Sequence, residues 1–223
     1  MCCLGPVYRI VRREELPKDC RFLSFGDIRN TMESGVRNVI EFMRIVGQLK
    51  RVKRTGWVNH KVQSPESVSD HMYRMAIMAM LIPDGQGLRR DHCVKMAIVH
   101  DLAESIVGDI APSDGVSKEE KFRREKEAMA HLSSLVDPTV GAELVSLWEE
   151  YEECASSEAK FVKDLDKFEM ILQAFEYESL QNRPMELQEF FRTTKGKFSH
   201  PTVLAWVDEV NRQREGKESD ETS

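Results

Sequence analysis

The 223-residue chain is long enough for one large domain or two small ones, and it can bury a core without disulfide cross-links. Apolar residues make up 41% and charged residues 31% of the sequence, which is typical of a globular protein rather than a disordered or fibrous one. The formal net charge of −6 argues against a general binder of nucleic acid polymers.

No segment of the sequence predicts a membrane span or a secretion signal. The longest nearly continuous apolar run, residues 75–82, is far shorter than the roughly 20 residues that a bilayer requires. The first residues lack the basic start, apolar core and cleavage site of a secretion signal. The five cysteines are scattered, odd in number and without a CxxC pair, so we expect an intracellular, cytoplasmic protein with reduced thiols.

The two ends of the chain differ in pattern from the residues between them. Residues 1–31 contain Pro6, Pro17 and Gly26, mixed charge and little periodicity, so we expect a poorly ordered extension, with Met32 as an alternative start. Residues 215–223 contain only Gly, Lys, Glu, Ser, Asp and Thr, which predicts a disordered tail. The folded domain is therefore expected to span residues 32–214.

From Ser34 the apolar residues step at three and four positions, which predicts an amphipathic helix. A basic loop, residues 50–64, follows and contains Arg54 and Trp57. The sequence Ser64-Pro65-Glu66 predicts the start of the next helix, because it combines a capping hydroxyl, a proline at the first helical position and an acid in the first turn. That helix is expected to end near Ile82, before Pro83.

The second half of the sequence is also helical in pattern. Asp91 is the predicted cap of a helix that ends at Gly108. Further helices are predicted over residues 117–135, 138–154, 157–181 and 201–214. Because no segment alternates convincingly like a strand, we expect an all-α fold, a compact helical bundle.

Ionisable residues interrupt the apolar faces of two of these predicted helices. His71 lies on the buried face of the first. His100 and Glu104 keep the apolar step of the second, and Asp101 flanks the same face. A single such histidine is more often a core residue satisfied by a hydrogen bond, and a His-Asp pair is common by chance, so only the combined set indicates a site.

The long helix predicted over residues 157–181 adds Asp166 at the edge of its apolar stripe, although periodicity alone does not choose Asp166 over Asp164. Burying unpartnered carboxylates and imidazoles costs several kcal/mol. Several of them on facing helices need a shared compensating charge, which a divalent cation supplies. Two imidazoles and two carboxylates suit Mn, Co, Fe, Zn or Mg, and they leave coordination positions for water and substrate oxygens. We therefore expect the helical bundle to surround a divalent metal site.

The segments that contain these residues resemble the signature of the HD superfamily of metal-dependent phosphohydrolases. In chain order they are residues 66–71 (ESVSDH), 99–104 (VHDLAE), 108–110 (GDI) and 164–166 (DLD). The HD-x-x-E pattern followed by Gly-Asp-Ile is similar to the 5′-deoxynucleotidase branch, and residues 46–51 and 54–58 resemble a eukaryotic group within it. The similarity covers roughly residues 36–207.

The resemblance implies an all-helical homodimer that hydrolyses deoxyribonucleoside 5′-monophosphates (dAMP, dCMP, dGMP and dTMP) to deoxynucleoside and phosphate. At the matching positions, His71, His100, Asp101 and Asp166 are the implied ligands of Mn²⁺, Co²⁺ or Mg²⁺. Glu104 matches an acidic residue beside the metal that has a catalytic role.

The resemblance also implies roles for residues outside the ligand set. Asp109 matches a second acid near the phosphate, and Glu104, Asp109 and the backbone carbonyl of Ile110 are implied ligands of a second cation. Arg54 and Trp57 resemble the family's substrate-contacting arginine and tryptophan. Those two residues are adjacent in bacterial members, whereas two residues separate them here.

Two other classes of function share part of this pattern. The first is another hydrolase on the same scaffold: a cyclic-nucleotide phosphodiesterase, a nucleoside triphosphohydrolase or a guanosine-tetraphosphate hydrolase. The single-domain length and the Gly-Asp-Ile turn favour the monophosphatase over these. The second is a catalytically idle module that binds metal or nucleotide, and Glu104 beside a complete ligand set argues against it.

Overall fold

The computed structural model describes residues 25–83 and 85–221, with side chains described over 33–83 and 85–216. Residues 1–24, which make up most of the predicted extension, lie outside the described part. Helix α1 (Phe25–Val46) begins before the predicted boundary at residue 32, because residues 25–37 contain no proline that would end a helix. The chain divides into two units, 1–37 and 38–223, within this helix.

The described residues are helical nearly throughout, as predicted for an all-α fold. After α1 the order is η2 (Gly47–Lys50), α2 (Thr55–Asn59), α3 (Val68–Met80), α4 (Arg90–Val99), α5 (Glu104–Val107), η3 (Pro112–Asp114), α6 (Lys118–Ser134), α7 (Pro138–Glu153), α8 (Ser157–Leu180), α9 (Gln188–Thr194) and α10 (Pro201–Glu221). Extended pairing among residues 25–83 and 85–221 is limited to one antiparallel bridge between Lys53 and Ser67.

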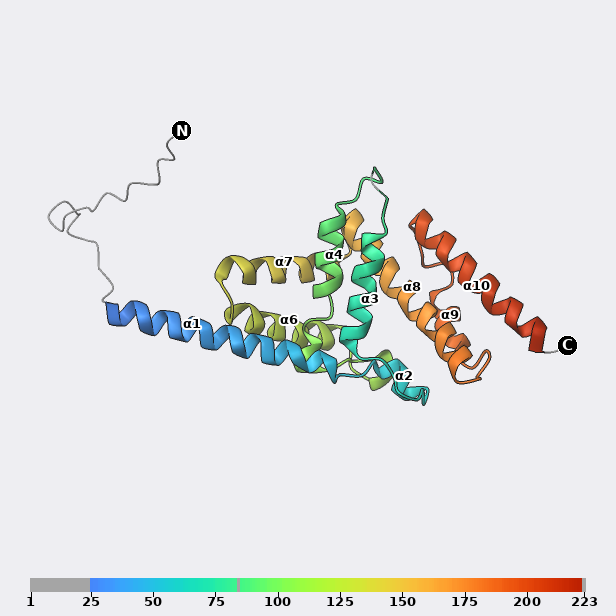
Figure 1. Ribbon diagram of the computed structural model, residues 1–223, viewed down its shortest axis with the longest axis horizontal. Helices are drawn as coiled ribbons and strands as arrows, with labels where there is room; N and C mark the ends of the chain where they lie inside the picture. The colour runs from blue at the N-terminus through green and yellow to red at the C-terminus, as the bar shows by residue number, and fades with distance from the viewer. Residues whose placement is uncertain (1–24, 84, 222–223) are drawn as a thin grey trace, which may run out of the picture. The chain divides into compact units, whose positions relative to one another are not determined.

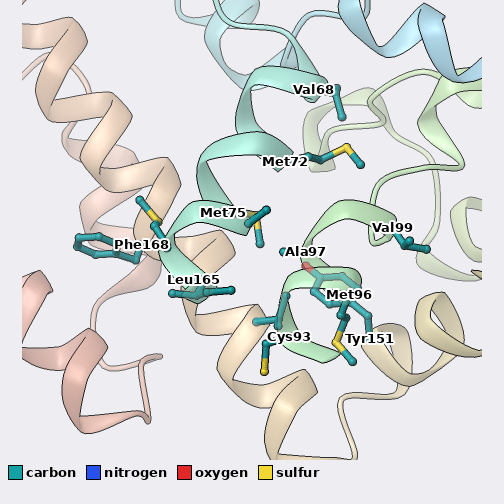
Figure 2. Packing of buried hydrophobic residues seen from close by; sticks show 14 of the residues in the cluster. Val68, Met72, Met75, Cys93, Met96, Ala97, Val99, Tyr151, Leu165 and Phe168 are labelled. Carbon is teal, nitrogen blue, oxygen red and sulfur yellow. The ribbon is translucent and has the colours of Figure 1, made fainter. Parts of the chain in front are cut away.

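Helices α3, α4 and α8 pack against one another and form the centre of the second unit (Figure 1). Helix α7 lies against both α4 and α8, α6 lies against α7, and α9 and α10 pack on α8. The interior between these helices is filled with methionine and aliphatic side chains, among them Met75 of α3, Met96 of α4 and Leu165 of α8 (Figure 2). Of the methionines on α3, Met72, Met75 and Met78 are buried in this core, whereas Met80 is exposed.

Helix α3 begins at Val68, three residues after the predicted start at Pro65. Its cap is Ser67, whose hydroxyl accepts the backbone N–H of Asp70 while the Asp70 carboxylate accepts the N–H of Ser67. The prediction of a cap at Ser64 was wrong because residues 66–68 first pair with the basic loop: the Arg54 N–H donates to the Glu66 carbonyl. This pairing fixes Arg54 beside the start of α3.

The helix predicted from Asp91 to Gly108 is broken into two. Helix α4 begins at Arg90, so that Asp91 lies in its first turn rather than at the cap. After Val99 the backbone hydrogen bonds tighten to three-residue steps, as in the bond from the Glu104 N–H to the Asp101 carbonyl. Gly108 ends α5 with a positive φ of 77°, as its residue type predicted.

The three predicted helices that follow match α6, α7 and α8 to within one residue at each end. The short helices α2 and α9 were not predicted. Helix α10 continues past the predicted end at residue 214, through most of the expected tail, to Glu221. Arg214 ties this helix to α8 through an ion pair with Glu178, and no proline follows Pro201 to interrupt it. None of the helices over residues 25–83 and 85–221 has the length and apolarity needed to cross a bilayer.

Candidate metal centre

Three structural elements bring the four predicted ligands together. His71 lies on α3, His100 and Asp101 lie at the tightened turn after α4, and Asp166 lies on α8. The Nε2 atom of His71 is 3.3 Å from Asp166 Oδ1 and 3.9 Å from Asp101 Oδ2. The Nε2 atom of His100 is 3.2 Å from the same Asp101 oxygen. Side chains separated by 95 positions in the sequence therefore converge on one point.

The two imidazoles are buried, and each has one ring nitrogen without a hydrogen-bond partner. His71 is 0% exposed and His100 is 3% exposed. Their Nδ1 atoms are occupied, by the Glu169 carboxylate and by the Ala97 carbonyl oxygen. Their Nε2 atoms make no hydrogen bond, although both are buried. A buried polar atom without a partner requires an explanation, and a bound cation at Nε2 supplies one.

The two aspartates of the cluster are ionised. Burial alone would raise the pKa of Asp101, but His100, Arg54 and His71 hold that pKa below its usual range. Burial likewise opposes the ionisation of Asp166, but the histidines and Arg54 hold its pKa well below the usual range. The donors are thus two lone-pair nitrogens and two carboxylates, a set that fits a divalent cation of the borderline or hard type.

The charges around His71 change the pKa of its imidazole. Without a cation, burial and the Arg54 charge lower the pKa of His71, but the carboxylates of Glu169 and Asp166 outweigh both effects and raise it to about 9. A bound cation would therefore take the place of the proton on Nε2. The guanidinium of Arg54 itself lies 3.3 Å from Asp101 and 3.8 Å from Asp166, measured from nitrogen to carboxylate oxygen. Arg54 therefore supplies part of the positive charge that the aspartates require.

The cluster opens into a cavity of about 300 Å³. Eleven of its lining residues have the charged, polar or aromatic side chains that are discussed below: Arg54, Trp57, His100, Asp101, Glu104, Asp109, Lys121, Tyr151, Lys163, Asp166 and Phe190. Glu104 lies in the wall of this cavity, is 2% exposed, and has one carboxyl oxygen without a hydrogen bond. Burial raises the pKa of Glu104 well above its usual range, and the charges of Asp101 and Asp109 add to that effect. Glu104 is therefore suited to hold a proton beside the metal centre.

The structure shows different contacts for Asp164 and Asp166, which the helical periodicity of the sequence could not distinguish. One oxygen of Asp164 accepts the backbone N–H groups of Ser199 and His200 and the hydroxyl of Ser199, while the other binds Lys167. Asp164 thus anchors the start of α10. Asp166 instead turns toward the histidines, and its second oxygen accepts the Tyr151 hydroxyl at 2.8 Å.

Asp109 and Ile110 both line the cavity. The Asp109 carboxylate accepts the backbone N–H of Thr55 at 2.6 Å, and its carbonyl oxygen accepts the Thr55 hydroxyl at 2.6 Å. Asp109 thereby caps the first turn of α2 and holds the preceding residue, Arg54, at the metal centre. Direct contact of Asp109 or Ile110 with a second cation stays a prediction.

Comparison with known proteins places this geometry in a family. The sequence profile of the HD domain matches residues 46–204, which include all four ligand positions. The chain belongs to the HD domain family. Among curated relatives, the 5′-deoxynucleotidase HDDC2 of Bos taurus is 59% identical over 180 residues, which cover 81% of this chain and 87% of that protein.

More distant members of the HD domain family share the same extent of the chain. The 5′-deoxynucleotidase hdd1 of Schizosaccharomyces pombe is 46% identical over 183 residues, covering 80% of this chain and 91% of its own. A solved structure from Pyrococcus horikoshii superposes with a TM-score of 0.65 at 34% identity, covering 78% of this chain and 98% of that one. The members of this family are metal-dependent phosphohydrolases, in agreement with the donor set described above.

The structure also places residues at this HD-domain site that the sequence patterns did not reveal. Tyr151 contacts Asp166, and Lys121, Lys163 and Phe190 line the cavity. The lysines belong to charged helix faces and Phe190 belongs to an unpredicted helix, so no local pattern marked them. Glu169 is different, because it follows Asp166 by three positions and so shares its helix face.

Trp57 is 2% exposed, although its ring forms part of the cavity wall. Its indole N–H donates to Glu66 at 2.8 Å, and its ring packs against Tyr177 and Phe190 at centroid distances of 5.4 and 4.4 Å. These contacts give Trp57 a packing role in the α2 region. Contact of Trp57 with substrate stays a prediction.

Substitution of Asp164 and substitution of Asp166 should have different effects on protein stability and on Mn²⁺ binding. Asp164→Ala should lower the free energy of unfolding by about 1–3 kcal/mol, because two backbone N–H groups at α10 lose their acceptor, and it should retain Mn²⁺ binding. Asp166→Ala should weaken Mn²⁺ binding by more than about 100-fold, since even outer partners of metal ligands account for 10–100-fold. Calorimetric titration and chemical denaturation of both variants measure these effects, and Mn²⁺ loss in Asp164→Ala alone would reverse the assignment.

Proposed function

We propose that the protein is a 5′-deoxynucleotidase that hydrolyses deoxyribonucleoside 5′-monophosphates, including dAMP, dCMP, dGMP and dTMP, to deoxynucleoside and phosphate. The observation that supports this most is the cluster of two buried histidines and two half-buried aspartates beside a cavity that is also lined by Glu104 and Arg54. The names of the curated relatives support the same activity and substrate class.

His71, His100, Asp101 and Asp166 are the proposed ligands of the cation, with Mn²⁺, Co²⁺ or Mg²⁺ as its identity. When bound, a divalent cation neutralises phosphate charge and lowers the pKa of a water molecule that can attack phosphorus. Mixed imidazole and carboxylate donors admit each of these ions. A second cation at Glu104, Asp109 and the carbonyl of Ile110 is the corresponding proposal for the outer part of the cavity.

Positive side chains in the cavity fit a phosphate dianion. Arg54 presents its guanidinium at the two aspartates, where it can donate two parallel hydrogen bonds to phosphate oxygens. Lys121 and Lys163 line the same cavity. Trp57 and Phe190, in the wall near Arg54, are the aromatic surfaces proposed to contact the nucleoside.

Glu104 is proposed to move the proton in this reaction. A water oxygen forms a bond to phosphorus while the bond from phosphorus to the 5′ oxygen breaks. The departing 5′ oxygen takes a proton from Glu104, and the proton that the attacking water releases restores the Glu104 carboxyl group. When no second cation is bound, burial raises the pKa of Glu104 and favours the protonated carboxyl group, which can donate to that oxygen. Asp109 supports the step by holding the backbone that leads into Arg54.

Metal dependence and substrate range test the proposed activity directly. After chelation the protein should release no phosphate from the four deoxynucleoside monophosphates, and Mn²⁺, Co²⁺ or Mg²⁺ should restore release. Ribonucleoside monophosphates, cyclic nucleotides and triphosphates, assayed in parallel, should be poorer substrates. Binding of dAMP by the metal-loaded protein without turnover would support an idle binding module instead, and release of pyrophosphate or triphosphate would support another hydrolase of the same scaffold.

Substitution of Glu104 tests its proposed proton transfer. Glu104→Gln should retain the Mn²⁺ ion held by the two histidines and two aspartates, and it should lower kcat on dAMP by about 10²–10⁴-fold, the usual size of a general acid effect. The loss should be much smaller with p-nitrophenyl phosphate, whose leaving group departs without a proton. An equal loss on both substrates would argue against Glu104 as the acid, and loss of Mn²⁺ would make it chiefly a ligand.

The protein is further proposed to form a homodimer through an apolar face built by the end of α1, η2, α3 and α4. The groove in this face has a volume of about 640 Å³. Five apolar side chains that line it are exposed by 41% to 70%: Met43, Tyr73, Ile77, Met80 and Ile98. Contiguous exposed apolar surface of this kind is typical of an interface, and a second copy of the chain can cover it symmetrically.

A charge placed in this face should separate the protomers. Ile77→Glu should sediment as a monomer while the wild type sediments as a dimer, because the carboxylate would be buried unpaired at the interface. Leu180→Glu, at a side chain that is 79% exposed and outside the groove, is the matched control and should remain dimeric. A monomeric wild type in analytical ultracentrifugation would contradict the proposal.

An intracellular, cytoplasmic location stays a proposal. The two cysteines within the described side chains, Cys93 and Cys154, are free thiols. Reduced thiols are typical of that compartment.

A further inference from the structure

The two ring nitrogens of His71 face different partners. Nε2 faces Asp101 and Asp166 and makes no hydrogen bond. Nδ1 lies 2.5 Å from Oε2 of Glu169, on the opposite side of the ring. A carboxylate can only accept, so the proton of this hydrogen bond belongs to Nδ1. With its one proton on Nδ1, the neutral ring directs the lone pair of Nε2 at the metal centre, where a cation would take the place of the second proton.

Glu169 is itself rigidly held. Its side chain is 0% exposed, and its other oxygen, Oε1, accepts from the guanidinium of Arg74 at 2.9 Å and 2.7 Å. The remaining donors of Arg74 bind Gln173 and Glu176, each at 2.7 Å. The acceptors on α8 thus fix the guanidinium, and the guanidinium fixes the Glu169 carboxylate.

A single helix face connects the two sides of the His71 ring. Asp166 and Glu169 are three positions apart on α8, so both point toward α3. Asp166 lies at the Nε2 side and Glu169 at the Nδ1 side. The packing of α3 on α8 therefore sets both the position and the tautomer of the histidine.

The carboxylates of Glu66 and Glu169 lie close enough to His71 Nδ1 to suggest a second cation site. The hydrogen bonds argue against that role. Both oxygens of Glu169 already have donors, and Glu66 accepts the indole N–H of Trp57. The adjacent charge of Arg74 would also repel a cation. This group of side chains is better explained as the support of a metal ligand.

We propose that Glu169, held by Arg74, is a positioning residue that fixes His71 with its proton on Nδ1 and its Nε2 lone pair toward the metal. This inference rests on the metal centre of the proposed function. Partners that bind the second nitrogen of a ligating histidine orient its ring and increase its basicity, and their removal typically weakens metal binding by about 10–100-fold.

Glutamine cannot replace Glu169 in this arrangement. The amide offers one oxygen, whereas Glu169 accepts from two donors on opposite sides, His71 and Arg74. In either orientation the amide NH₂ group would face another donor. Glu169→Gln therefore disturbs the hydrogen bonds while it nearly preserves the volume of the side chain.

Titration with Co²⁺ alone, measured by calorimetry on the full chain, tests the proposal. Glu169→Gln should raise the Kd for Co²⁺ by about 10–100-fold. Glu178→Gln is the matched control, because Glu178 is also a buried carboxylate of α8 paired with an arginine, Arg214, but does not touch a metal ligand. The control should leave the Kd unchanged within about twofold. An unchanged Kd in Glu169→Gln would overturn the proposal.

The imidazole N–H protons give a second measurement that a general loss of stability would not reproduce. In ¹H NMR of the Co²⁺-loaded protein, the paramagnetic ion shifts the N–H signals of bound imidazoles away from all other signals. Two such shifted N–H signals are expected, one from His71 and one from His100. Glu169→Gln should broaden or shift one of them and leave the other, since His100 Nδ1 contacts the Ala97 carbonyl instead. Retention of both signals unchanged would overturn the proposal.

If Glu169→Gln unfolds because Arg74 loses its partner, the double variant Arg74→Gln/Glu169→Gln removes both charges, and the same Kd and NMR effects are expected in it. A wild-type protein that binds no Co²⁺ would overturn the metal centre itself. If the wild type binds Co²⁺ and Glu169→Gln binds it with the same Kd and the same NMR signals, only the role of Glu169 would be overturned.

Discussion

Two half-buried carboxylates and two buried imidazoles share one space between α3, α4 and α8, and the free energy of removing these groups from water constrains the residues around them. An ionised carboxylate out of water costs several kcal/mol unless opposite charge compensates it. The surroundings supply that compensation in part: Arg54 lies against both aspartates, and Tyr151 donates to Asp166. The unpartnered Nε2 atoms of the histidines complete a donor set for a divalent cation.

The helical scaffold accounts for how these groups meet. In a continuous helix after residue 90, His100 and Glu104 would share one face and Asp101 would lie about 100° away from His100. The tightened backbone after Val99 turns Asp101 toward His71 and leaves Glu104 in the cavity wall. The basic loop is fixed from two sides, by its pairing with the start of α3 and by the Asp109 carboxylate, so that Arg54 reaches the same point.

Much of this site could be predicted from the sequence, because the helical periodicity shows where an ionisable residue takes the place of an apolar one on the buried face of a helix. His71, His100 and Glu104 were found in that way, and the long helices α6 to α8 were predicted nearly to the residue. The helical periodicity does not show which residues from different helices contact each other. The distinction between Asp164 and Asp166 depends on the start of α10, 35 positions away.

The same limit explains the residues that were missed. Phe190 belongs to a seven-residue helix too short for its apolar period to be recognised. Glu169 is one of many acids on α8, and only its contacts with His71 and Arg74 distinguish it. The cap of α3 was predicted at Ser64 from a capping signal in the sequence. That signal does not reveal that residues 66–68 pair with the basic loop before the helix begins.

The position of the cation is the most direct test of this account. Anomalous diffraction from crystals grown with Mn²⁺ locates the ion without reference to activity. The account predicts a peak in contact with Nε2 of His71 and His100 and with the carboxylates of Asp101 and Asp166. A Mn²⁺-loaded crystal with no peak between those four side chains, or with its peak at another group of acids, would contradict it.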